Sequence, residues 1–455
     1  MCPSYMVTLE EKHSTRGRAH MLFEMLQGEE LKEGWQDEGV KEALDLCLSC
    51  KGCKGECPVN VDMATYKAEF MSHYYEKHPR PLNALAFGHI DRWAELASVA
   101  PEIANFFSQT PGFSDLMKSV LDVPTQRQIP AFAPQTFREW FNRRKQDRSP
   151  GPQVILWPDT FNNHFHPHTA RAAVEVLEHM GWRVRIPREK LCCGRPLYDF
   201  GMLHEAKRYL KRILDSLGRD IEAGYPILVL EPSCASVFKE ELKNLLPDEP
   251  LTEKLSGQTM LLSEFLQKKA TEFEFPQVKR KALIQAHCHH KSIFKTDAEE
   301  QVFKRLGIEA KVLDSGCCGM AGPFGFEASK YEVSQACGER VLLPAVRKAA
   351  EDEIIVADGF SCREQIRQNT NRYSLHLADV IKMALDNQLP KSGKPEKPVV
   401  KKIESEAARG KVKTAAALGL MLGGVTFAMM VLSGKNRKAR GPKVLEMPPR
   451  GDSIQ

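Results

Sequence analysis

The chain has 455 residues, more than a single ordinary domain, and its 42% hydrophobic and 27% charged residues are typical of a globular protein. A net charge of +5 is too small to indicate nucleic-acid binding, so we expect no nucleic-acid partner. Thirteen cysteines are many, but their odd number and their adjacent pairs argue against a disulfide framework. We therefore expect reduced thiols that bind metal.

Residues 1–75 are expected to form a small helical metal-binding domain. Apolar residues recur every three or four positions on both sides of "CLSCKGCKGECP", which contains Cys47, Cys50, Cys53 and Cys57. The spacing C-x2-C-x2-C-x3-C-P is that of a bacterial ferredoxin, in which three thiolates bind one 4Fe-4S cluster and the fourth binds a second cluster. A zinc site would usually have two separated C-x2-C pairs. The motif therefore predicts an iron–sulfur cluster.

The fourth ligand of this cluster has two candidates. Cys2, which is also followed by proline, looks like the last cysteine of an earlier copy of the motif whose first three cysteines are absent. In the interpretation that we favour, Cys2 completes the cluster of Cys47, Cys50 and Cys53, and Cys57 binds a cluster that another chain completes. In the other, Cys57 is itself the fourth ligand. We expect a chain shortened from a longer ancestor, or a sequence that starts at an internal methionine.

An internal repeat determines the fold that we expect for residues 151–390. "VILWPDTFNN" and "ALIQAHCHHK" each begin a copy as an apolar strand followed by a polar loop, a helix and a second strand. The Cys-Cys-Gly tripeptides that come next are 125 residues apart, and the cysteines after the last strands are 128 residues apart. Alternating strands and helices predict a mostly parallel sheet in each copy. The cysteines should then meet at the carboxyl edge of each sheet.

The predicted architecture is α+β and multidomain. The segments are a helical 4Fe-4S ferredoxin domain (1–75), a helical connector (76–150), two α/β modules (151–273 and 274–390), a linker (391–413), an apolar helix (414–434) and a basic tail (435–455). The apolar helix has no charge over 21 residues. At ~1.5 Å per residue it would cross roughly 30 Å, about one bilayer core. We expect it to span a membrane; the alternative is a buried or fraying helix.

These motifs, in this order, resemble a known family. "MCPSYMVTLEEKHSTRGRAHMLFEML", "CLSCKGCKGECPVNVDM" and the two Cys-Cys-Gly (CCG) modules are similar to the iron–sulfur subunit of glycolate oxidase and to the C-terminal half of fused FAD-linked oxidase and ferredoxin proteins. The CCG modules are also similar to the CCG-containing subunit of heterodisulfide reductase. The resemblance covers residues 1 to about 385 and implies a fold of ferredoxin domain plus CCG modules.

The resemblance implies electron transfer. A flavin-containing dehydrogenase subunit would oxidise a 2-hydroxy acid of the glycolate or lactate type, and the clusters would pass electrons to quinone or another membrane acceptor. The sequence has no glycine-rich nucleotide fingerprint, so FAD is expected only on a partner chain. No catalytic residue is assigned. The expected location is the cytoplasmic side of a membrane, with the apolar helix as anchor.

The family pattern for one CCG module is a cysteine, the Cys-Cys-Gly tripeptide and a final cysteine. The second copy matches it with Cys288, Cys317, Cys318 and Cys362, and the first keeps only Cys192, Cys193 and Cys234. Four thiolates suit a 4Fe-4S cluster or a closed zinc site. In the first copy Thr160 replaces the leading cysteine. Three thiolates could hold a cluster with an open iron, bound by water, a substrate thiol or His164; they could also hold zinc, or nothing.

Other polar residues have two possible roles. Arg16 and Arg18 are expected either near the ferredoxin cluster, where positive charge raises the reduction potential, or simply at the start of a helix. The histidines of "HFHPH" and "HCHH" are expected to be solvated or to support ligands. Cys337 is expected to be a small buried residue. Besides electron transfer, a thiol–disulfide reductase and a metal-binding scaffold or redox sensor are the alternatives.

Overall fold

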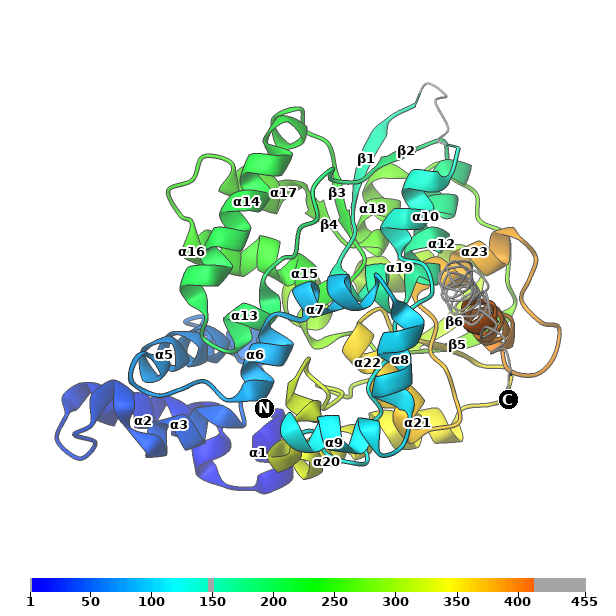
Figure 1. Ribbon diagram of the computed structural model, residues 1–455. Coiled ribbons are helices and arrows are strands. Elements are labelled where there is room, and N and C mark those ends of the chain that lie inside the picture. Colours follow the sequence, from blue (N-terminus) through cyan, green and yellow to red (C-terminus); the bar gives the residue numbers. More distant parts are fainter. Residues whose placement is uncertain (1, 146–150, 413–455) are drawn as a thin grey trace, which may run out of the picture. The chain divides into compact units, whose positions relative to one another are not determined.

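The computed structural model describes residues 2–145 and 151–412 (Figure 1). Contacts divide the chain into a compact unit over Met1–Glu404 and a second unit over Ser405–Gln455. All thirteen cysteines belong to the first unit and all are free thiols. The cysteines are therefore available as metal ligands.

The first part of the chain is helical, as its periodicity predicts. Its elements are α1 (Pro3–Thr8), η1 (Glu11–His13), α2 (Thr15–Gln27), η2 (Gly34–Gln36), α3 (Glu38–Asp45), α4 (Gly52–Glu56) and α5 (Met63–Lys77). The side chains of Ser14, Asp37 and Asp62 begin α2, α3 and α5 by accepting hydrogen bonds from the first-turn amides. Buried apolar residues such as Leu44 and Phe70 pack these helices together. The packing holds the ends of two loops that carry cysteines, one before α1 and one between α3 and α4.

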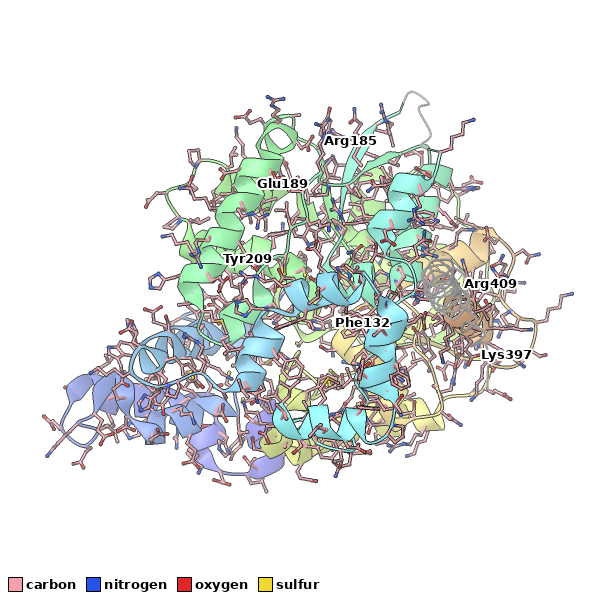
Figure 2. The ribbon with its side chains drawn as sticks, viewed as in Figure 1. Phe132, Arg185, Glu189, Tyr209, Lys397 and Arg409 are labelled. Atoms are coloured by element: carbon pink, nitrogen blue, oxygen red, sulfur yellow. The ribbon has the colours of Figure 1, made fainter. Side chains whose placement is uncertain are left out.

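Five further helices precede the first sheet. They are α6 (Leu82–Gly88), α7 (Ile90–Ala97), α8 (Pro101–Gln109), α9 (Phe113–Val120) and α10 (Phe137–Arg143). Tyr209 fixes α7, since its hydroxyl donates to Asp91 and accepts from Arg92 (Figure 2). Phe132, in the extended stretch before α10, exchanges two hydrogen bonds with the side chain of Asn105 on α8. These helices are thereby attached to the modules that follow.

The first module contains a four-stranded parallel sheet. Its strands are β1 (Gln153–Trp157), β2 (Arg183–Arg185), β3 (Ile227–Val229) and β4 (Thr259–Met260), in the order β2-β1-β3-β4. The helices are α11 (Thr160–His164), α12 (Pro167–His179), α13 (Arg195–Asp199), α14 (Leu203–Glu222), α15 (Pro232–Ser236), η3 (Val237–Glu241), α16 (Leu242–Leu245), α17 (Thr252–Gln258) and α18 (Leu262–Lys269). Figure 1 shows α12 and α14 on opposite sides of this sheet, because alternate residues of β1 face two different cores.

The second module contains a three-stranded parallel sheet. Its strands are β5 (Arg280–Ile284), β6 (Ile308–Val312) and β7 (Ile354–Val356), in the order β6-β5-β7. The other elements are η4 (His290–Phe294), α19 (Asp297–Arg305), η5 (Phe324–Phe326), η6 (Ala328–Lys330), α20 (Tyr331–Glu339), α21 (Leu342–Lys348), α22 (Phe360–Asn369) and α23 (Leu377–Leu385). Both sheets repeat the order in which the first strand of the module lies between the second and the third. The repeat in the sequence is thus a repeat of structure.

The two modules share a core. Val154 and Leu156 of β1 belong to the same apolar cluster as Ala282 and Ile284 of β5, together with residues of α12, α18, α19 and α23. Burying this many apolar side chains between the sheets favours one folded body over two independent ones. Residues 2–145 and 151–404 therefore act as one mechanical support for all the cysteine groups.

One predicted helix differs between the copies. The sequence predicts a helix of about four turns after each Cys-Cys-Gly. In the first copy α14 is longer, with 20 residues, or about five and a half turns at ~3.6 residues per turn. In the second copy the helix is divided into α20 and α21. Pro344 explains the break, because a proline lacks an amide hydrogen and its ring would clash with the carbonyl of residue 340 in a continuous helix.

Within the described ranges, no helix has the length and apolar character needed to cross a bilayer. The predicted span, 414–434, lies outside those ranges. The fold is therefore a mostly helical α/β structure with two parallel sheets.

Candidate metal centre

The loop between α3 and α4, together with α4 itself, brings the first three thiols of the ferredoxin motif near Cys2. Burial raises the pKa of the Cys50 thiol, and the charges of Cys288, Cys2 and Cys47 raise it further. Burial also raises the pKa of Cys53, on which Cys47 and Cys2 act as well. Ser49 and Lys51 lie in the left-handed region (φ 51° and 60°), which curls the loop tightly. Cys2, Cys47, Cys50 and Cys53 thus share one neighbourhood.

Arg18 lies directly beside Cys2. Its guanidinium donates to Cys2 Sγ at 3.0 Å, to Ser4 Oγ at 2.8 Å and to the carbonyl of Ala43 at 2.7 Å, and only 1% of the residue is exposed. Burial raises the pKa of Cys2, but the charge of Arg18 and the hydrogen bonds from Arg18 and Ser4 together lower it below its usual value. Arg16, by contrast, is exposed and paired with Glu11. Of the two predicted arginines, Arg18 is the one next to the thiols.

Cys57 stands apart from this group. The backbone amides of Val61 and Val59 lower the pKa of its thiol, and among the described residues no other cysteine contributes to that shift. Its backbone accepts a hydrogen bond from the amide of Asn60. The geometry therefore groups Cys2, and not Cys57, with the other three thiols. The assignment of ligands stays a prediction.

The second module brings four thiols to the carboxyl edge of its sheet. They follow β5, β6 and β7, where a parallel sheet gathers the ends of its strands: Cys288, Cys317, Cys318 and Cys362. Each of the four affects the pKa of the next in the series Cys288, Cys317, Cys318 and Cys362, so the thiols lie side by side. All but Cys288 are buried. Sequence positions more than 70 residues apart thus form one sulfur-lined site.

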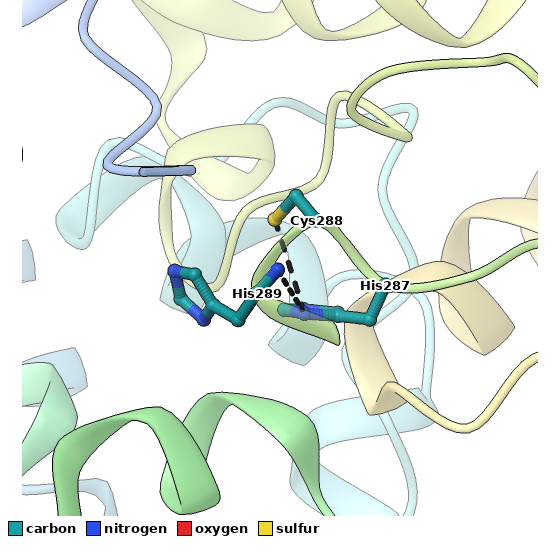
Figure 3. A group of neighbouring side chains, drawn as sticks. All are labelled: His287, Cys288 and His289. Carbon is teal, nitrogen blue, oxygen red and sulfur yellow. Dashed lines mark hydrogen bonds between the residues drawn. The ribbon is translucent and has the colours of Figure 1, made fainter. Parts of the chain in front are cut away.

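Two histidines flank Cys288 (Figure 3). Nδ1 of His287 lies 3.8 Å from Cys288 Sγ and accepts the backbone amide hydrogen of His289 at 3.2 Å. Burial lowers the pKa of His287, but the charge and hydrogen bond of Cys288, with the charges of Glu231 and Cys318, together raise it to about 9. One ligand atom of His289 lies within 4.8 Å of those of His287 and Cys288, while its Nε2 is 2.9 Å from the Ser49 carbonyl oxygen. His287 therefore supports the thiolate, as expected for a residue next to a ligand.

The first module gathers three thiols and a hydroxyl. Cys193 Sγ lies 3.1 Å from Cys234 Sγ, and the neighbouring Cys193 thiol raises the pKa of Cys192. The hydroxyl of Thr160 donates to Cys192 Sγ at 3.6 Å, so Thr160 occupies the place of a leading cysteine. His164 is bonded elsewhere, with Nδ1 2.7 Å from Ser98 Oγ and Nε2 2.9 Å from Asn163. This position makes His164 a poor fourth ligand.

Residues next to all three thiol groups contact one another at the main chain of Ser49. Its carbonyl accepts hydrogen bonds from Arg195 at 3.1 Å and from His289 Nε2 at 2.9 Å. Arg195 follows the Cys-Cys-Gly of the first module, and His289 follows Cys288 of the second. Next to Ser49, buried Lys51 pairs with Glu241 (3.1 Å) of the first module. One peptide of the ferredoxin loop therefore connects all three groups.

The ferredoxin group adjoins the second module most closely. The charge of Cys288 raises the pKa of Cys50, which shows that the two residues are close. Leu48 packs with Cys317 and Phe324 in a small apolar cluster that Cys288 also touches. The hydroxyl of Ser292 donates to the carbonyl of Cys50 at 3.3 Å. The ferredoxin thiols and the thiols of the second module are thus neighbours.

Sequence reasoning missed several supporting residues. No sequence motif assigns a role to Arg195, to Lys51 or to the carbonyl of Ser49. Arg195 could have been noticed because it directly follows a Cys-Cys-Gly tripeptide. Cys337 is buried as predicted, and its thiol donates to the carbonyl of Pro3. Gly319 has a φ of 89°, and a Cβ there would lie 2.1 Å from a carbonyl oxygen of α20. The glycine is therefore needed for close helix packing, rather than for approach to a metal.

Comparison with known families and proteins agrees with this geometry. Residues 1–61 match the family model of the 4Fe-4S dicluster domain, and residues 160–239 and 283–367 match that of the cysteine-rich domain. The chain is 26% identical to D-2-hydroxyglutarate dehydrogenase of Pseudomonas putida over 84% of its own length and 41% of the relative. It is also 26% identical to one subunit of the anaerobic glycerol-3-phosphate dehydrogenase of Escherichia coli, over 68% of this chain and 79% of that relative. Lactate utilization protein A of Bacillus licheniformis is 28% identical over 50% of this chain and 98% of its own.

The chain spans about two fifths of the D-2-hydroxyglutarate dehydrogenases that it matches. Buried thiols in groups are the donors that iron–sulfur clusters require, so the residues fit the cofactor that a dicluster domain implies. The chain carries a 4Fe-4S dicluster domain followed by two cysteine-rich CCG regions, and it is a distant homologue of oxidoreductase subunits and domains.

Proposed function

We propose that the chain takes electrons from a flavin-dependent 2-hydroxy acid dehydrogenase of the glycolate or lactate type and passes them to a membrane acceptor such as quinone. Iron–sulfur clusters, when bound, accept and release single electrons. The observation that supports this proposal best is the junction at Ser49, where residues next to all three thiol groups bind one peptide. Such contacts fix the separation of redox sites.

Within this proposal the ligands are assigned by proximity. Cys2, Cys47, Cys50 and Cys53 hold one 4Fe-4S cluster, and Cys57 is free for a cluster that another chain completes. The second CCG module holds a further cluster through its four thiols, and the first holds an open cluster or zinc through three. Arg18 would favour the reduced cluster by its positive charge near Cys2.

A solution experiment tests the route directly. The anaerobically reconstituted chain is mixed with the co-purifying flavoprotein and, in turn, with glycolate, D-lactate, D-2-hydroxyglutarate or glycerol 3-phosphate. We expect the broad visible absorbance of the clusters to bleach with one of these substrates and only when the flavoprotein is present. Bleaching by substrate without the flavoprotein, or its absence with every substrate and a flavoprotein shown to be reduced, would contradict the proposal.

An apolar face on α7–α9 is the proposed contact surface for the dehydrogenase. Its exposed side chains are Trp93, Leu96, Val99, Ile103, Phe106, Phe107, Phe113, Leu116 and Val120. The rings of Phe106, Phe107 and Phe113 touch one another, which joins α8 to α9 within this face. A continuous exposed apolar patch is typical of a protein interface. Dehydrogenase relatives extend well beyond the matched region, which favours a dehydrogenase as the occupant.

Leu116→Glu, at a position 66% exposed on α9, should weaken this contact. A buried charge in an apolar interface is costly, and we expect the dehydrogenase recovered in a pull-down to fall at least ~10-fold. Leu26→Glu is the matched control, because Leu26 is 71% exposed on α2, away from this face. Iron content should equal that of the wild type in both variants. Equal recovery with Leu116→Glu would rule out this face.

Membrane attachment is proposed to depend on the apolar segment 414–434. A chain truncated after residue 411 should leave the membrane fraction, whereas the full chain should sediment with it and resist carbonate washing. The truncated chain should keep its iron, because every cysteine precedes residue 363. A truncated chain that still sediments with membranes would contradict the anchor.

The three-thiol site of the first module supports a second candidate function, a thiol–disulfide reductase. An iron without a fourth protein ligand could bind a substrate sulfur there, beside partly exposed Cys192. A disulfide substrate that changes the electron paramagnetic resonance (EPR) spectrum, and is reduced catalytically, would favour this candidate.

A further inference from the structure

Three buried ligand-type side chains lie behind the thiols of the second module. His290 begins η4, Glu299 belongs to α19 and Asp358 follows β7. They are 1%, 1% and 5% exposed, and one ligand atom of each lies within 4.8 Å of those of the others. None of the three belongs to the cysteine sets, and neither the ferredoxin motif nor the CCG pattern accounts for them. The group therefore needs its own explanation.

Within the part of the chain that the structure describes, three side-chain polar atoms of this group lack hydrogen-bond partners. Among the described residues, both ring nitrogens of His290 and Oε2 of Glu299 have no hydrogen bond, although His290 Nδ1 lies 3.5 Å from that oxygen. Asp358 accepts one hydrogen bond from the amide of Leu377 at 2.8 Å. His376 is 3.6 Å from Asp358, but its Nε2 is bonded to the carbonyl of Leu230. Buried polar atoms without partners are costly, and two nearby carboxylates call for a cation.

The repeat provides an internal comparison. Asn162 of the first copy corresponds to His290, 128 residues later, and the Asn162 side chain accepts a hydrogen bond from the guanidinium of Arg363 at 2.9 Å. Arg363 follows the last cysteine of the second copy and corresponds to Ala235 in the first. Ala235 belongs to α15, the helix that contacts η4. The first module thus receives the guanidinium of Arg363 from the second module. In the reverse direction, the second module meets only the methyl group of Ala235.

We propose that His290, Glu299 and Asp358 bind a divalent metal ion, zinc by preference, at a site separate from the cysteine thiols. One imidazole and two carboxylates are typical zinc ligands, and they balance the charge of a divalent ion. The ion would join η4, α19 and the segment after β7. Cys288 lies two residues before His290, and Cys362 lies four residues after Asp358. The ion would therefore position two of the four thiols of the second module.

The test is zinc analysis and zinc X-ray absorption of the anaerobic holoprotein after incubation with zinc and gel filtration. We expect about one zinc per chain with nitrogen and oxygen neighbours at ~2.0–2.1 Å, separate from any zinc of the first CCG module, which would show the ~2.3 Å sulfur shell of a cysteine site. Glu299→Gln, of nearly equal size, should lose this zinc. Glu300→Gln removes the same charge from the exposed next position of α19 and should retain it. Iron and acid-labile sulfide should match the wild type in both.

Absence of zinc with nitrogen and oxygen neighbours in the wild type, or full retention of that zinc in Glu299→Gln, would each overturn the proposal. The wild-type spectrum decides the question even if Glu299→Gln proves unstable. The inference does not depend on the proposed electron route, since neither measurement uses a dehydrogenase or an acceptor.

Discussion

Replacing Cys50 by serine is expected to remove the iron–sulfur cluster of the ferredoxin group, whereas Cys57→Ser should leave it in place. Cys50 lies among Cys2, Cys47 and Cys53, while the thiol of Cys57 is held by its own backbone turn. A cubane cluster contains four irons, so Cys50→Ser should cost about four irons per chain. Iron and sulfide analysis of anaerobically reconstituted protein, with EPR spectra after reduction, measures the loss.

Cys2→Ser separates the two interpretations of the fourth ligand. We expect it to resemble Cys50→Ser, because Cys2 shares the neighbourhood of Cys50 and Cys53. A cluster that survives in Cys2→Ser and disappears in Cys57→Ser would make Cys57 the ligand. The Ser49 carbonyl keeps its contacts in all these variants, so the signal of the CCG modules should remain. Loss of both signals together would mean that the boundary predicted near residue 150 is wrong.

The fold was largely predictable because the cysteines mark the repeat. Equal spacing of the Cys-Cys-Gly tripeptides and of Cys234 and Cys362 aligned the copies, and alternating strands and helices then implied parallel sheets. The shared core was not predictable. A strand such as "VILW" is apolar on both faces, and its composition does not say whether its partner is a helix or the other module. Pro344 could have indicated the break between α20 and α21. The helical periodicity on both sides of it nevertheless favours a continuous helix.

The candidate site was predictable where residue type alone restricts the chemistry. Cysteines in fixed spacings indicated thiol groups, and the gathering of Cys2 with Cys50 agrees with the favoured interpretation. Supporting contacts were not predictable, because a carbonyl such as that of Ser49 exists in every residue and acquires a role only through long-range packing. Arg195 and His289 come from segments 94 residues apart, and only the fold brings them to one atom.

Where the native first module holds zinc or no metal, Thr160→Cys is expected to complete its CCG set and to add about four irons per chain. Thr160 Oγ1 lies 3.6 Å from Cys192 Sγ, so a thiol at this position would join three others that are already in contact. Asp159 caps α11 by accepting hydrogen bonds from the amides of Phe161 and Asn162, and the substitution leaves this cap untouched. The new thiol should therefore face the site. Iron, zinc and sulfide analysis after anaerobic reconstitution gives the count.

Thr160→Val is the matched control, because valine keeps the size and branching of threonine but has no ligand atom. Its iron content should equal that of the wild type. An unchanged iron count in Thr160→Cys would show that the three native thiols are packed too closely to open around a cluster, as the 3.1 Å separation of Cys193 and Cys234 allows. Zinc in place of iron would instead assign the first module a structural metal. The native threonine would then mark the point at which the two copies diverged in function: one kept four thiols for a redox cofactor, while the other kept the scaffold around Ser49 with only three.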